Sequence, residues 1–292
     1  MTADGEPLGS LCCLASVTLR ARAEETEDAA VLWGGGDSTC RGVAVADGLG
    51  SYINAGEAAR FAVQQAAALA QSLEPASAAG LCALFSRLRQ DLRGEFGKRE
   101  PPPDASQPCY GTTLLLGVET PTHLLAAYVG NGAIWHLRGN FHESAPANGL
   151  PWSSANYLRP HSLYRDGKEQ LYNLIAFSEQ FDRFPPTVIA VDKDPRFGDI
   201  LLLCTDGVCS ADRLLHGTDA QGDLWIKAEE PMVEFYACLG DYFSQPCGGP
   251  SLDDRLQHFL QGLKDRSLIE DDATLGLIVT GAAREYQRRK GS

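Results

Sequence analysis

The chain has 292 residues, of which 44% are hydrophobic and 22% charged, and it carries a net charge of −13. This composition supplies enough apolar material for a sizeable core and argues against a disordered chain. The acidic balance disfavours nucleic acid as a partner, because binding to phosphates requires a basic face. The densest basic run is the short tail REYQRRK at 284–290.

The sequence predicts a cytoplasmic protein that does not enter a membrane. Its first ten residues, MTADGEPLGS, are acidic and lack the basic region of a secretory signal. No apolar run approaches the roughly 20 residues that cross a bilayer. The nine cysteines are scattered and form no C-x-x-C pair, so we expect reduced thiols rather than a zinc ribbon or a thioredoxin-like site.

The first third of the chain is predicted to begin with strands and to continue with helices. Residues 29–33 (AAVLW) and 42–46 (GVAVA) are apolar runs separated by a glycine-rich stretch, as in a hairpin. Residues 55–73 and 81–96 then repeat apolar side chains every three to four positions, which predicts two amphipathic helices lying on a sheet. The proline-rich stretch KREPPPDASQP at 98–108 is predicted to be a surface loop.

Strands are predicted to resume after this loop. The runs at 112–118 (TTLLLGV), 123–130 (HLLAAYVG) and 133–137 (AIWHL) are separated by small turns, which predicts an antiparallel meander. Residues 139–168 show no clear period. A stretch of that length inside a compact domain is usually functional or flexible, so we expect an irregular loop or flap there.

The last part of the chain repeats the order of strands followed by helices. Three apolar runs are predicted strands: 171–177, 187–191 and 200–205. Apolar side chains with helical spacing then predict helices through 232–243 and 252–263, before a final strand at 274–279. The basic tail is expected to be a solvated helix end.

The predicted elements are grouped rather than alternating. Strands, two helices, many strands, two helices and one last strand differ from the strict β-α alternation of a doubly wound fold. We therefore expect an α+β protein whose antiparallel sheets are covered by helices. Neither an internal repeat nor a compositional boundary interrupts the sequence, so residues 1–292 are expected to form a single domain.

Acidic residues recur at the ends of predicted strands: Asp47 after GVAVA, Asp206 after ILLLCT, Asp271 and Asp272 before ATLGLIV, and Glu27 and Asp28 before AAVLW. If these ends converge, the carboxylates repel and raise one another's pKa values. A pair of Mg²⁺ or Mn²⁺ ions would relieve that repulsion and clamp a phosphoryl group. Glycine after Asp47 would let the Gly48 carbonyl approach an ion. The residues alone leave open a second interpretation, in which each acid belongs to a separate solvated turn.

The order and spacing of these motifs resemble the metal-dependent serine/threonine protein phosphatases of type 2C, in particular divergent bacterial members. Six blocks carry the resemblance: TEDA at 26–29, VAVADGLGSYINAGEAA at 43–59, YGTTLLLGV at 110–118, YVGNGAIWHL at 128–137, GDILLLCTDGV at 198–208 and DDATLGLIV at 271–279. Each block is weak alone, but six in this order over about residues 15–280 are fairly specific. The resemblance implies a four-layer α-β-β-α sandwich of two antiparallel sheets flanked by helix pairs.

The resemblance also implies a reaction and its metal ligands. The reaction is hydrolysis of phosphoserine and phosphothreonine in proteins, by a water activated at a centre of two Mg²⁺ or Mn²⁺ ions. By motif, Asp47 would bridge both ions and the Gly48 carbonyl would bind the first, while Asp206 and Asp271 would bind the second. The implied partner is a phosphorylated protein, such as a serine/threonine kinase or its target, in cytoplasmic signalling. The oligomeric state does not follow from the resemblance.

Four further positions are compared with the family pattern. Glu27 and Asp28 would orient waters on the ions, a role outside the ligand shell itself. Asp272 stands where the family frequently has Asn, so it is not expected to be a first-choice ligand. Arg22 would bind the substrate phosphate, although the family's arginine aligns with Ala23 and the assignment needs a shift by one residue.

Some positions depart from the family pattern. Asn131 stands in place of the Asp of the G-D-S-R block, and Ser210 in place of a further Asp, which implies that a third metal site is absent or weakened. Leu49 replaces a His that acts as a general acid in some members. These departures motivate an alternative, a catalytically weak or inactive phosphatase-fold binding or regulatory module. A different two-metal hydrolase, such as a phosphodiesterase, is disfavoured because no histidine adjoins the aspartate motifs.

Overall fold

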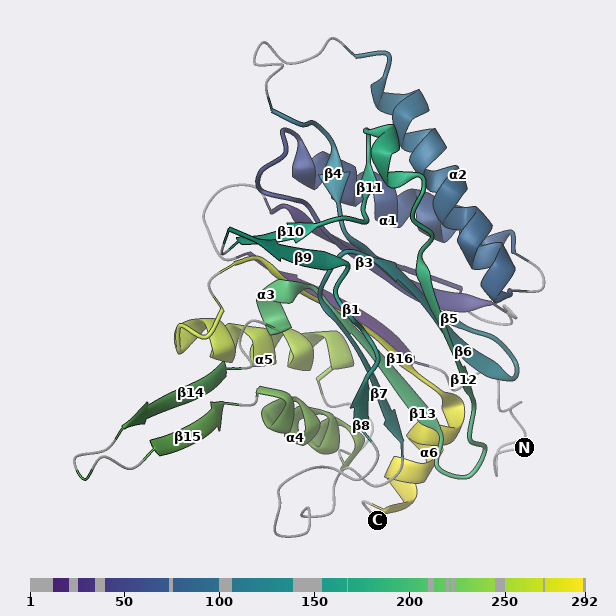
Figure 1. Ribbon diagram of the computed structural model, residues 1–292. Helices are drawn as coiled ribbons and strands as arrows, with labels where there is room; N and C mark the ends of the chain where they lie inside the picture. Colours follow the sequence, from purple (N-terminus) through teal and green to yellow (C-terminus); the bar gives the residue numbers. More distant parts are fainter. Residues whose placement is uncertain are drawn as a thin grey trace.

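The computed structural model describes residues 13–20, 26–34, 40–73, 76–99, 107–138, 154–166, 168–209, 213–218, 221, 224–229, 231–244, 250–269 and 271–290. Two five-stranded antiparallel sheets pack face to face, and helices cover the outer face of each (Figure 1). The predicted four-layer α-β-β-α sandwich is therefore confirmed. None of the helices in the described ranges is long and apolar enough to cross a membrane.

The first sheet has the strand order β12-β6-β5-β3-β2. Its strands in chain order are β2 (Asp28–Trp33), β3 (Arg41–Asp47), β5 (Leu114–Glu119), β6 (His123–Val129) and β12 (Thr187–Asp192). Its outer face is covered by α1 (Ala55–Gln71) and α2 (Ala78–Phe96). Alternation along β3 explains the packing, since Ala44 and Ala46 face the alanine-rich α1 while Val43 and Val45 face the other sheet.

The second sheet has the strand order β1-β16-β13-β7-β8. Its strands in chain order are β1 (Cys13–Leu19), β7 (Ala133–Arg138), β8 (Ser154–Asn156), β13 (Asp199–Cys204) and β16 (Ala273–Val279). Helices α4 (Pro231–Ser244) and α5 (Leu252–Asp265) bury their apolar faces against it. The helix at the end of the chain, α6 (Gly281–Lys290), is more buried than expected, because the Gln287 side chain is only 2% exposed.

The predicted antiparallel meander is wrong at its third strand. Strands β5 and β6 do pair with each other, but β7 leaves this sheet and pairs with β13 and β8 in the other. The chain crosses between the sheets through Gly130 and Gly132, whose φ angles of 95° and 114° are strained for other residues. Apolar spacing does not distinguish a turn within one sheet from a turn between two sheets.

Several shorter elements also differ from the predictions. The run 112–118 is interrupted at Thr113, with β4 (Gly111–Thr112) preceding β5. Only parts of 171–177 are strand, at the end of β10 (Lys168–Leu171) and in β11 (Ile175–Ala176). Within the expected flap, residues 154–166 contain β8 and β9 (Ser162–Arg165), while 139–153 lie outside the described residues. Strand β1 and the hairpin of β14 (Arg213–Thr218) and β15 (Leu224–Glu229) were not predicted.

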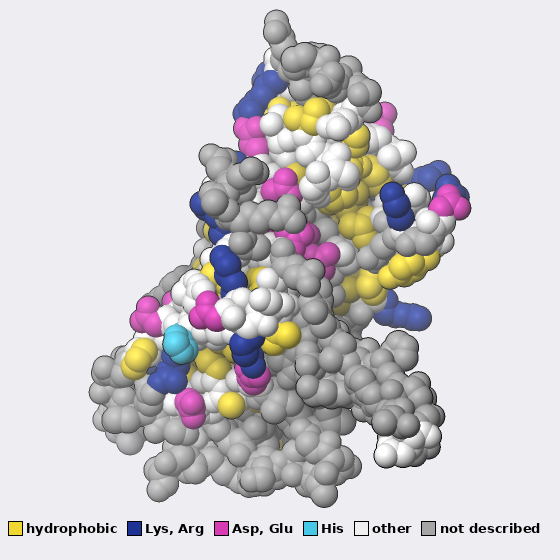
Figure 2. Space-filling model, turned by 90° about the vertical axis from the view of Figure 1, so that its left-hand side faces the viewer, with side chains coloured by type: hydrophobic (Ala, Val, Ile, Leu, Met, Phe, Trp, Pro, Cys, Tyr) yellow, Lys and Arg dark blue, Asp and Glu magenta, His cyan; other side chains and the backbone are white. Residues whose placement is uncertain are grey.

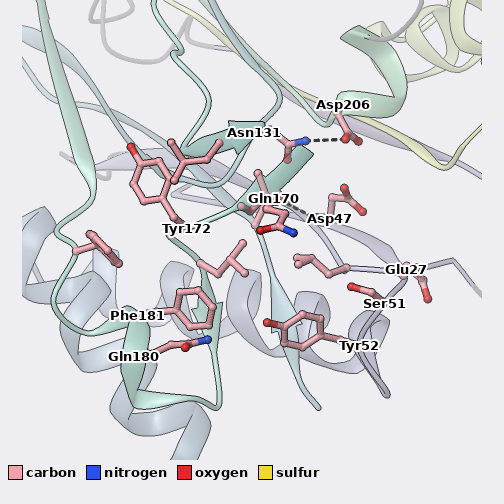
Figure 3. Close-up of a pocket in the computed structure, with 18 of the residues that line it drawn as sticks. Glu27, Asp47, Ser51, Tyr52, Asn131, Gln170, Tyr172, Gln180, Phe181 and Asp206 are labelled. Atoms are coloured by element: carbon pink, nitrogen blue, oxygen red, sulfur yellow. Dashed lines mark hydrogen bonds between the residues drawn. The ribbon is translucent and has the colours of Figure 1, made fainter. Parts of the chain in front are cut away.

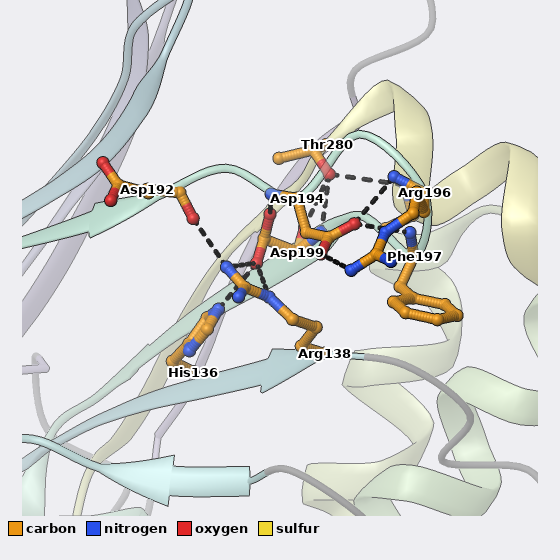
Figure 4. Close-up of polar contacts among 9 residues, drawn as sticks. His136, Arg138, Asp192, Asp194, Arg196, Phe197, Asp199 and Thr280 are labelled. Carbon is orange, nitrogen blue, oxygen red and sulfur yellow. Dashed lines mark hydrogen bonds and ion pairs between the residues drawn. The ribbon is translucent and has the colours of Figure 1, made fainter.

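A buried polar network anchors β13 at the end opposite to Asp206 (Figure 4). The Asp199 side chain is fully buried, and its Oδ1 lies 2.9 Å from His136 Nε2 and accepts a 2.7 Å hydrogen bond from Arg138 Nε. Its Oδ2 accepts the N–H of Asp194 at 2.7 Å, and its main chain is paired with Thr280. Buried charge is tolerated when it is paired and hydrogen-bonded, and here it fixes where β13 begins.

Asp194 in the loop before β13 gives a pH-dependent prediction. Its carboxylate accepts the N–H groups of Arg196 at 2.7 Å and Phe197 at 3.1 Å, and these hydrogen bonds hold its pKa down at about 2. A pKa below the unfolded value stabilises the fold above pH ~4, and this contribution disappears as the pH falls toward 2. We expect Asp194→Asn to lower the free energy of unfolding by about 1 kcal/mol at neutral pH. Urea denaturation at two pH values checks this, and a difference that does not shrink in acid would contradict it.

Candidate functional site

The strand ends that carry the predicted acidic residues meet in one groove, and Asp and Glu side chains gather near the middle of this face (Figure 2). The groove has a volume of about 1260 Å³. Its lining includes most of the predicted site positions: Glu27, Asp47, Gly48, Asn131, Asp206 and Asp271. These residues come from separate segments of both sheets, so the interpretation as independent solvated turns does not hold.

Hydrogen bonds between the two sheets hold these ends together. The Glu27 N–H donates to Asp272 Oδ2 at 2.9 Å, which joins the start of β2 to the start of β16. The Thr205 hydroxyl donates to Asp28 Oδ2 at 2.9 Å, which joins the end of β13 to β2. Thr205 is itself paired with Thr274 of β16 through its main chain and hydroxyl. Asp28 and Asp272 thus accept hydrogen bonds that link the two sheets.

Asp47 ends β3, and both threonines of the G-T-T block fix its main chain. The Asp47 N–H donates to Thr113 Oγ1 at 3.0 Å, and its carbonyl accepts from the Thr113 N–H and the Thr112 hydroxyl, both at 2.8 Å. With the backbone held in this way, the carboxylate is the part of Asp47 that lines the groove (Figure 3). The sequence showed this threonine block as a motif, and the structure supplies its physical reason.

Gly48 continues the strand as an isolated bridge to Thr112, and its N–H donates to the Glu27 carbonyl at 3.1 Å. The two hydrogen bonds of the bridge are made by the flanking residues, so the bridge does not use the Gly48 carbonyl. A Cβ at this position would lie 2.5 Å from the carbonyl carbon of Ala55. Glycine is therefore required by the first turn of α1, a reason that the sequence did not reveal.

The carboxylates of Asp28 and Asp47 oppose each other across β2 and β3, as direct partners in the strand register. Asp28 is 2% exposed, and its Oδ1 is buried without a hydrogen-bond partner. Burial raises the pKa of Asp28 to about 6, against the lowering effect of hydrogen bonds such as that of Thr205. Burial, then the charges of Asp28 and Asp206, raise the pKa of Asp47 well above its usual range. Like charges directly opposite each other destabilise a sheet, so this pair favours a bound cation.

Asp206 begins the short helix α3 (Asp206–Cys209) and is held by Asn131. Asn131 Nδ2 donates to Asp206 Oδ2 at 2.8 Å (Figure 3). An amide here adds a hydrogen-bond donor and leaves one negative charge fewer than the family's Asp would. Asp271 lines the same groove and is exposed, with its Oδ1 accepting the N–H of Asp272 at 2.9 Å.

The groove offers metal ligands of the right kind for a hard divalent cation. Carboxylate and carbonyl oxygens are what Mg²⁺ and Mn²⁺ prefer, and the unpartnered Asp28 Oδ1 marks a local excess of acceptors. Within the described ranges, no group of three or more His, Cys, Asp or Glu side chains lies close enough together to hold an ion. Mg²⁺ usually takes one or two carboxylates and several waters, so the Gly48 carbonyl and waters would have to complete its shell.

Three other predicted positions do not belong to this set of possible metal ligands. Arg22 and Ser210 lie outside the described residues, so the phosphate-binding and third-metal assignments stay predictions. Leu49 lines the groove, so an apolar side chain occupies the position where some family members have a general acid.

The sequence did not reveal the wall of the groove that faces these acids. This wall comes from β9, β10 and the loop through η2 (Glu179–Phe181), and includes Tyr164, Arg165, Tyr172 and Arg183. Tyr164 is 79% exposed, although it is large and partly apolar. The irregular stretch 139–168, predicted to be functional or flexible, includes Tyr164 and Arg165, but no motif pointed to these side chains or to Tyr172 and Arg183.

Comparisons with known proteins give the family. The family model described as Protein phosphatase 2C matches residues 20–261, which include Glu27, Asp47 and Asp206 but end before Asp271. No curated protein matches the sequence.

Solved structures of bacterial proteins share the fold. Serine/threonine phosphatase Stp1 from Staphylococcus aureus has a TM-score of 0.61 at 13% identity, with 92% of this chain and 94% of that chain covered. PppA from Pseudomonas aeruginosa has 0.60 at 17% identity, covering 92% and 97%. The serine/threonine phosphatase PstP/Ppp from Mycobacterium tuberculosis has 0.58 at 14% identity, covering 92% and 98%. Because the family match spans most of the sequence, this chain belongs to the protein phosphatase 2C family.

Proposed function

We propose that this protein hydrolyses phosphoserine and phosphothreonine in proteins, with Mg²⁺ or Mn²⁺ bound in the acidic groove. The observation that carries the proposal is the convergence of Glu27, Asp47, Asp206 and Asp271 on one opening. Four carboxylates repel a phosphate dianion, so an acidic groove suits this substrate only when cations are present. Family membership supports the reaction class, and the expected substrate is a serine/threonine kinase or one of its targets.

The proposed ligands divide between the two sheets. Bound ions would supply charge neutralisation, a water of lowered pKa and a hold on the phosphoryl oxygens. Asp47 is the proposed bridging ligand, with the Gly48 carbonyl on one ion and with Asp206 and Asp271 on the other. This assignment uses carboxylates and a carbonyl that line one groove.

The remaining residues support those ligands. Asp28 faces Asp47 from the buried side and keeps its orientation through the Thr205 hydroxyl. Glu27 lines the groove, where its carboxylate can orient water by hydrogen bonding. Asn131 holds Asp206 in one orientation through its amide. These contacts fix the ligand positions before substrate arrives, which reduces the cost of reorganisation.

Release of phosphate from a phosphothreonine peptide, measured with and without Mn²⁺, tests the proposal, together with calorimetric titration of Mn²⁺. We expect turnover that depends on Mn²⁺ and stops with EDTA. If the folded protein binds Mn²⁺ but releases no phosphate, the proposed enzymatic activity is wrong and the alternative of a regulatory module is favoured. A protein that binds no Mn²⁺ would overturn the proposed centre itself.

A further inference from the structure

Arg89 on α2 is a buried arginine outside the acidic centre. Its side chain is 2% exposed, and all three guanidinium nitrogens donate hydrogen bonds. Nε donates to the Leu174 carbonyl at 2.9 Å and Nη1 to the Phe184 carbonyl at 2.9 Å. Nη2 donates to Asn173 Oδ1 at 2.6 Å. One side chain therefore joins the two ends of a segment that we call the 173–185 loop.

Two further contacts close the same loop. Asn173 Nδ2 donates to the Pro185 carbonyl at 2.8 Å, so the first and last residues of the loop are also linked directly. One turn farther along α2, Arg93 makes a two-pronged ion pair with Asp182, at 3.0 and 2.8 Å. Helix α2 thus holds both the base and the outer part of the 173–185 loop.

The other side of this loop faces the groove. Leu174, Gln180, Phe181, Arg183 and Phe184 all line it, and Figure 3 shows Gln180 and Phe181 on the side opposite Asp206. The Arg183 guanidinium lies over the Phe184 ring, 4.8 Å from its centroid. This cation–π contact helps to fix the orientation of the exposed Arg183 side chain.

The loop is also joined to the acidic end. Its strand β11 pairs Ile175 with Thr112 of β4, and the Thr112 hydroxyl donates to the Asp47 carbonyl at 2.8 Å. The wall and the carboxylates therefore share one framework. A shift of the loop relative to Asp47 would change the width of the groove without changing any proposed ligand.

The energetics of Arg89 favour a geometric role. Burial disfavours its charge and lowers its pKa, and the three groups that it binds are neutral. An apolar side chain would fill a buried position at a smaller desolvation cost. What arginine adds is a rigid planar fork that reaches several acceptors at fixed angles, which lysine does not provide.

We propose that Arg89 is a positioning residue that holds the 173–185 loop as a preformed wall of the groove, and thereby governs recognition of the residues flanking the phosphorylated side chain. The inference rests on the proposed function, because it takes the groove as the binding site of a phosphoprotein. A groove of about 1260 Å³ has room for neighbouring residues that reach the wall. A small aryl phosphate needs only the acidic end.

The test compares Arg89→Met and Arg89→Lys with Arg87→Met as a matched control. Arg87 lies on the same helix, and its exposed side chain pairs with Asp91 at 2.7 Å rather than with the loop. For Arg89→Met we expect KM for a phosphothreonine peptide to rise about tenfold with little change in kcat, since a misplaced wall weakens binding more than chemistry. p-Nitrophenyl phosphate should be hydrolysed as by the unchanged protein. For Arg89→Lys, KM for the peptide should lie between the values of the unchanged protein and Arg89→Met. Arg87→Met should leave hydrolysis of both substrates unchanged.

A second readout does not depend on activity. Hydrogen exchange of amides in the 173–185 loop, such as those of Phe177 and Asp182, should accelerate in Arg89→Met and not in Arg87→Met. Unchanged exchange, or equal losses on the peptide and the aryl phosphate, would overturn the inference.

Failure of the proposed function can be recognised separately. If the unchanged protein hydrolyses neither phosphorylated substrate, the affinity for the phosphothreonine peptide is measured instead, by fluorescence anisotropy with Mn²⁺ present. Arg89→Met must then weaken this affinity. If Arg89→Met does not fold, Asn173→Ala takes its place, because it removes one acceptor of Arg89 and the link to Pro185.

Discussion

Asp47→Asn is expected to lower kcat by about 1,000-fold or more while leaving the fold intact, because it removes the charge of the proposed bridging ligand. The main chain of Asp47 should stay in place, since its hydrogen bonds to Thr112 and Thr113 do not involve the carboxylate. Phosphopeptide turnover at saturating Mn²⁺ measures the effect. Calorimetry should show that the affinity for Mn²⁺ falls together with kcat.

The same variant is expected to be more stable than the unchanged protein when no metal is present. The pKa of Asp47 is raised in the fold by burial and by the charges of Asp28 and Asp206, so its ionised form costs stability at neutral pH. An amide removes that repulsion and offers a donor to the unpartnered Asp28 Oδ1. Thermal unfolding in EDTA should show a midpoint that is about 2–5 °C higher.

Added Mn²⁺ should reverse the order of the two proteins, because an ion that binds only the folded state stabilises it by mass action. Asp192→Asn is the control, since this side chain is 93% exposed and lies outside the groove. If Asp47→Asn keeps full turnover, the proposed centre is wrong. If it loses stability in EDTA, the repulsion inferred between Asp28 and Asp47 is wrong.

The parts of the site that sequence could predict are those whose cause is local. Strand β3 is a short apolar run that ends at Asp47, and Asp206 follows the end of β13 by two residues, so both acids could be placed at strand ends without a structure. The sequence also suggested that these strand ends converge. The structure gives the cause: β2 and β3 pair in a register that sets Asp28 opposite Asp47, and the Thr205 hydroxyl donates a hydrogen bond to Asp28. Local pattern is sufficient where burial and chain reversal act on neighbouring residues.

The parts that sequence could not predict depend on distant contacts. The run 171–177 contains enough apolar residues to resemble a strand, but Arg89, a distant residue on α2, binds the Leu174 carbonyl and the Asn173 side chain within it and holds it in the groove wall. Strand β7 carries an ordinary strand pattern, and two glycines with positive φ place it in the second sheet. Long-range hydrogen bonds and a turn between sheets leave no periodic signal in the sequence.

Gly207→Ala is expected to cost about 2 kcal/mol of folding free energy and to reduce kcat/KM about 100-fold, because a misplacement near 1 Å has effects of this size. An added Cβ would lie 1.9 Å from the carbonyl oxygen of Asp272 and 3.3 Å from the Cα of Ala273. Both are backbone atoms and cannot rotate away, as a side chain could. Either α3 lifts and draws Asp206 from its ligand position, or the start of β16 moves with Asp271.

The matched control is Gly262→Ala on α5, where an added Cβ meets no atom within 4 Å. This change should raise stability by about 0.5–1 kcal/mol, since alanine favours a helix more than glycine does, and should leave turnover unchanged. Urea denaturation and phosphopeptide hydrolysis measure both variants. Because neither glycine has a side chain that could bind metal or substrate, a loss confined to Gly207→Ala would show that the contact of α3 with Asp272 sets the position of Asp206. If the two variants behave alike, that contact does not position the site.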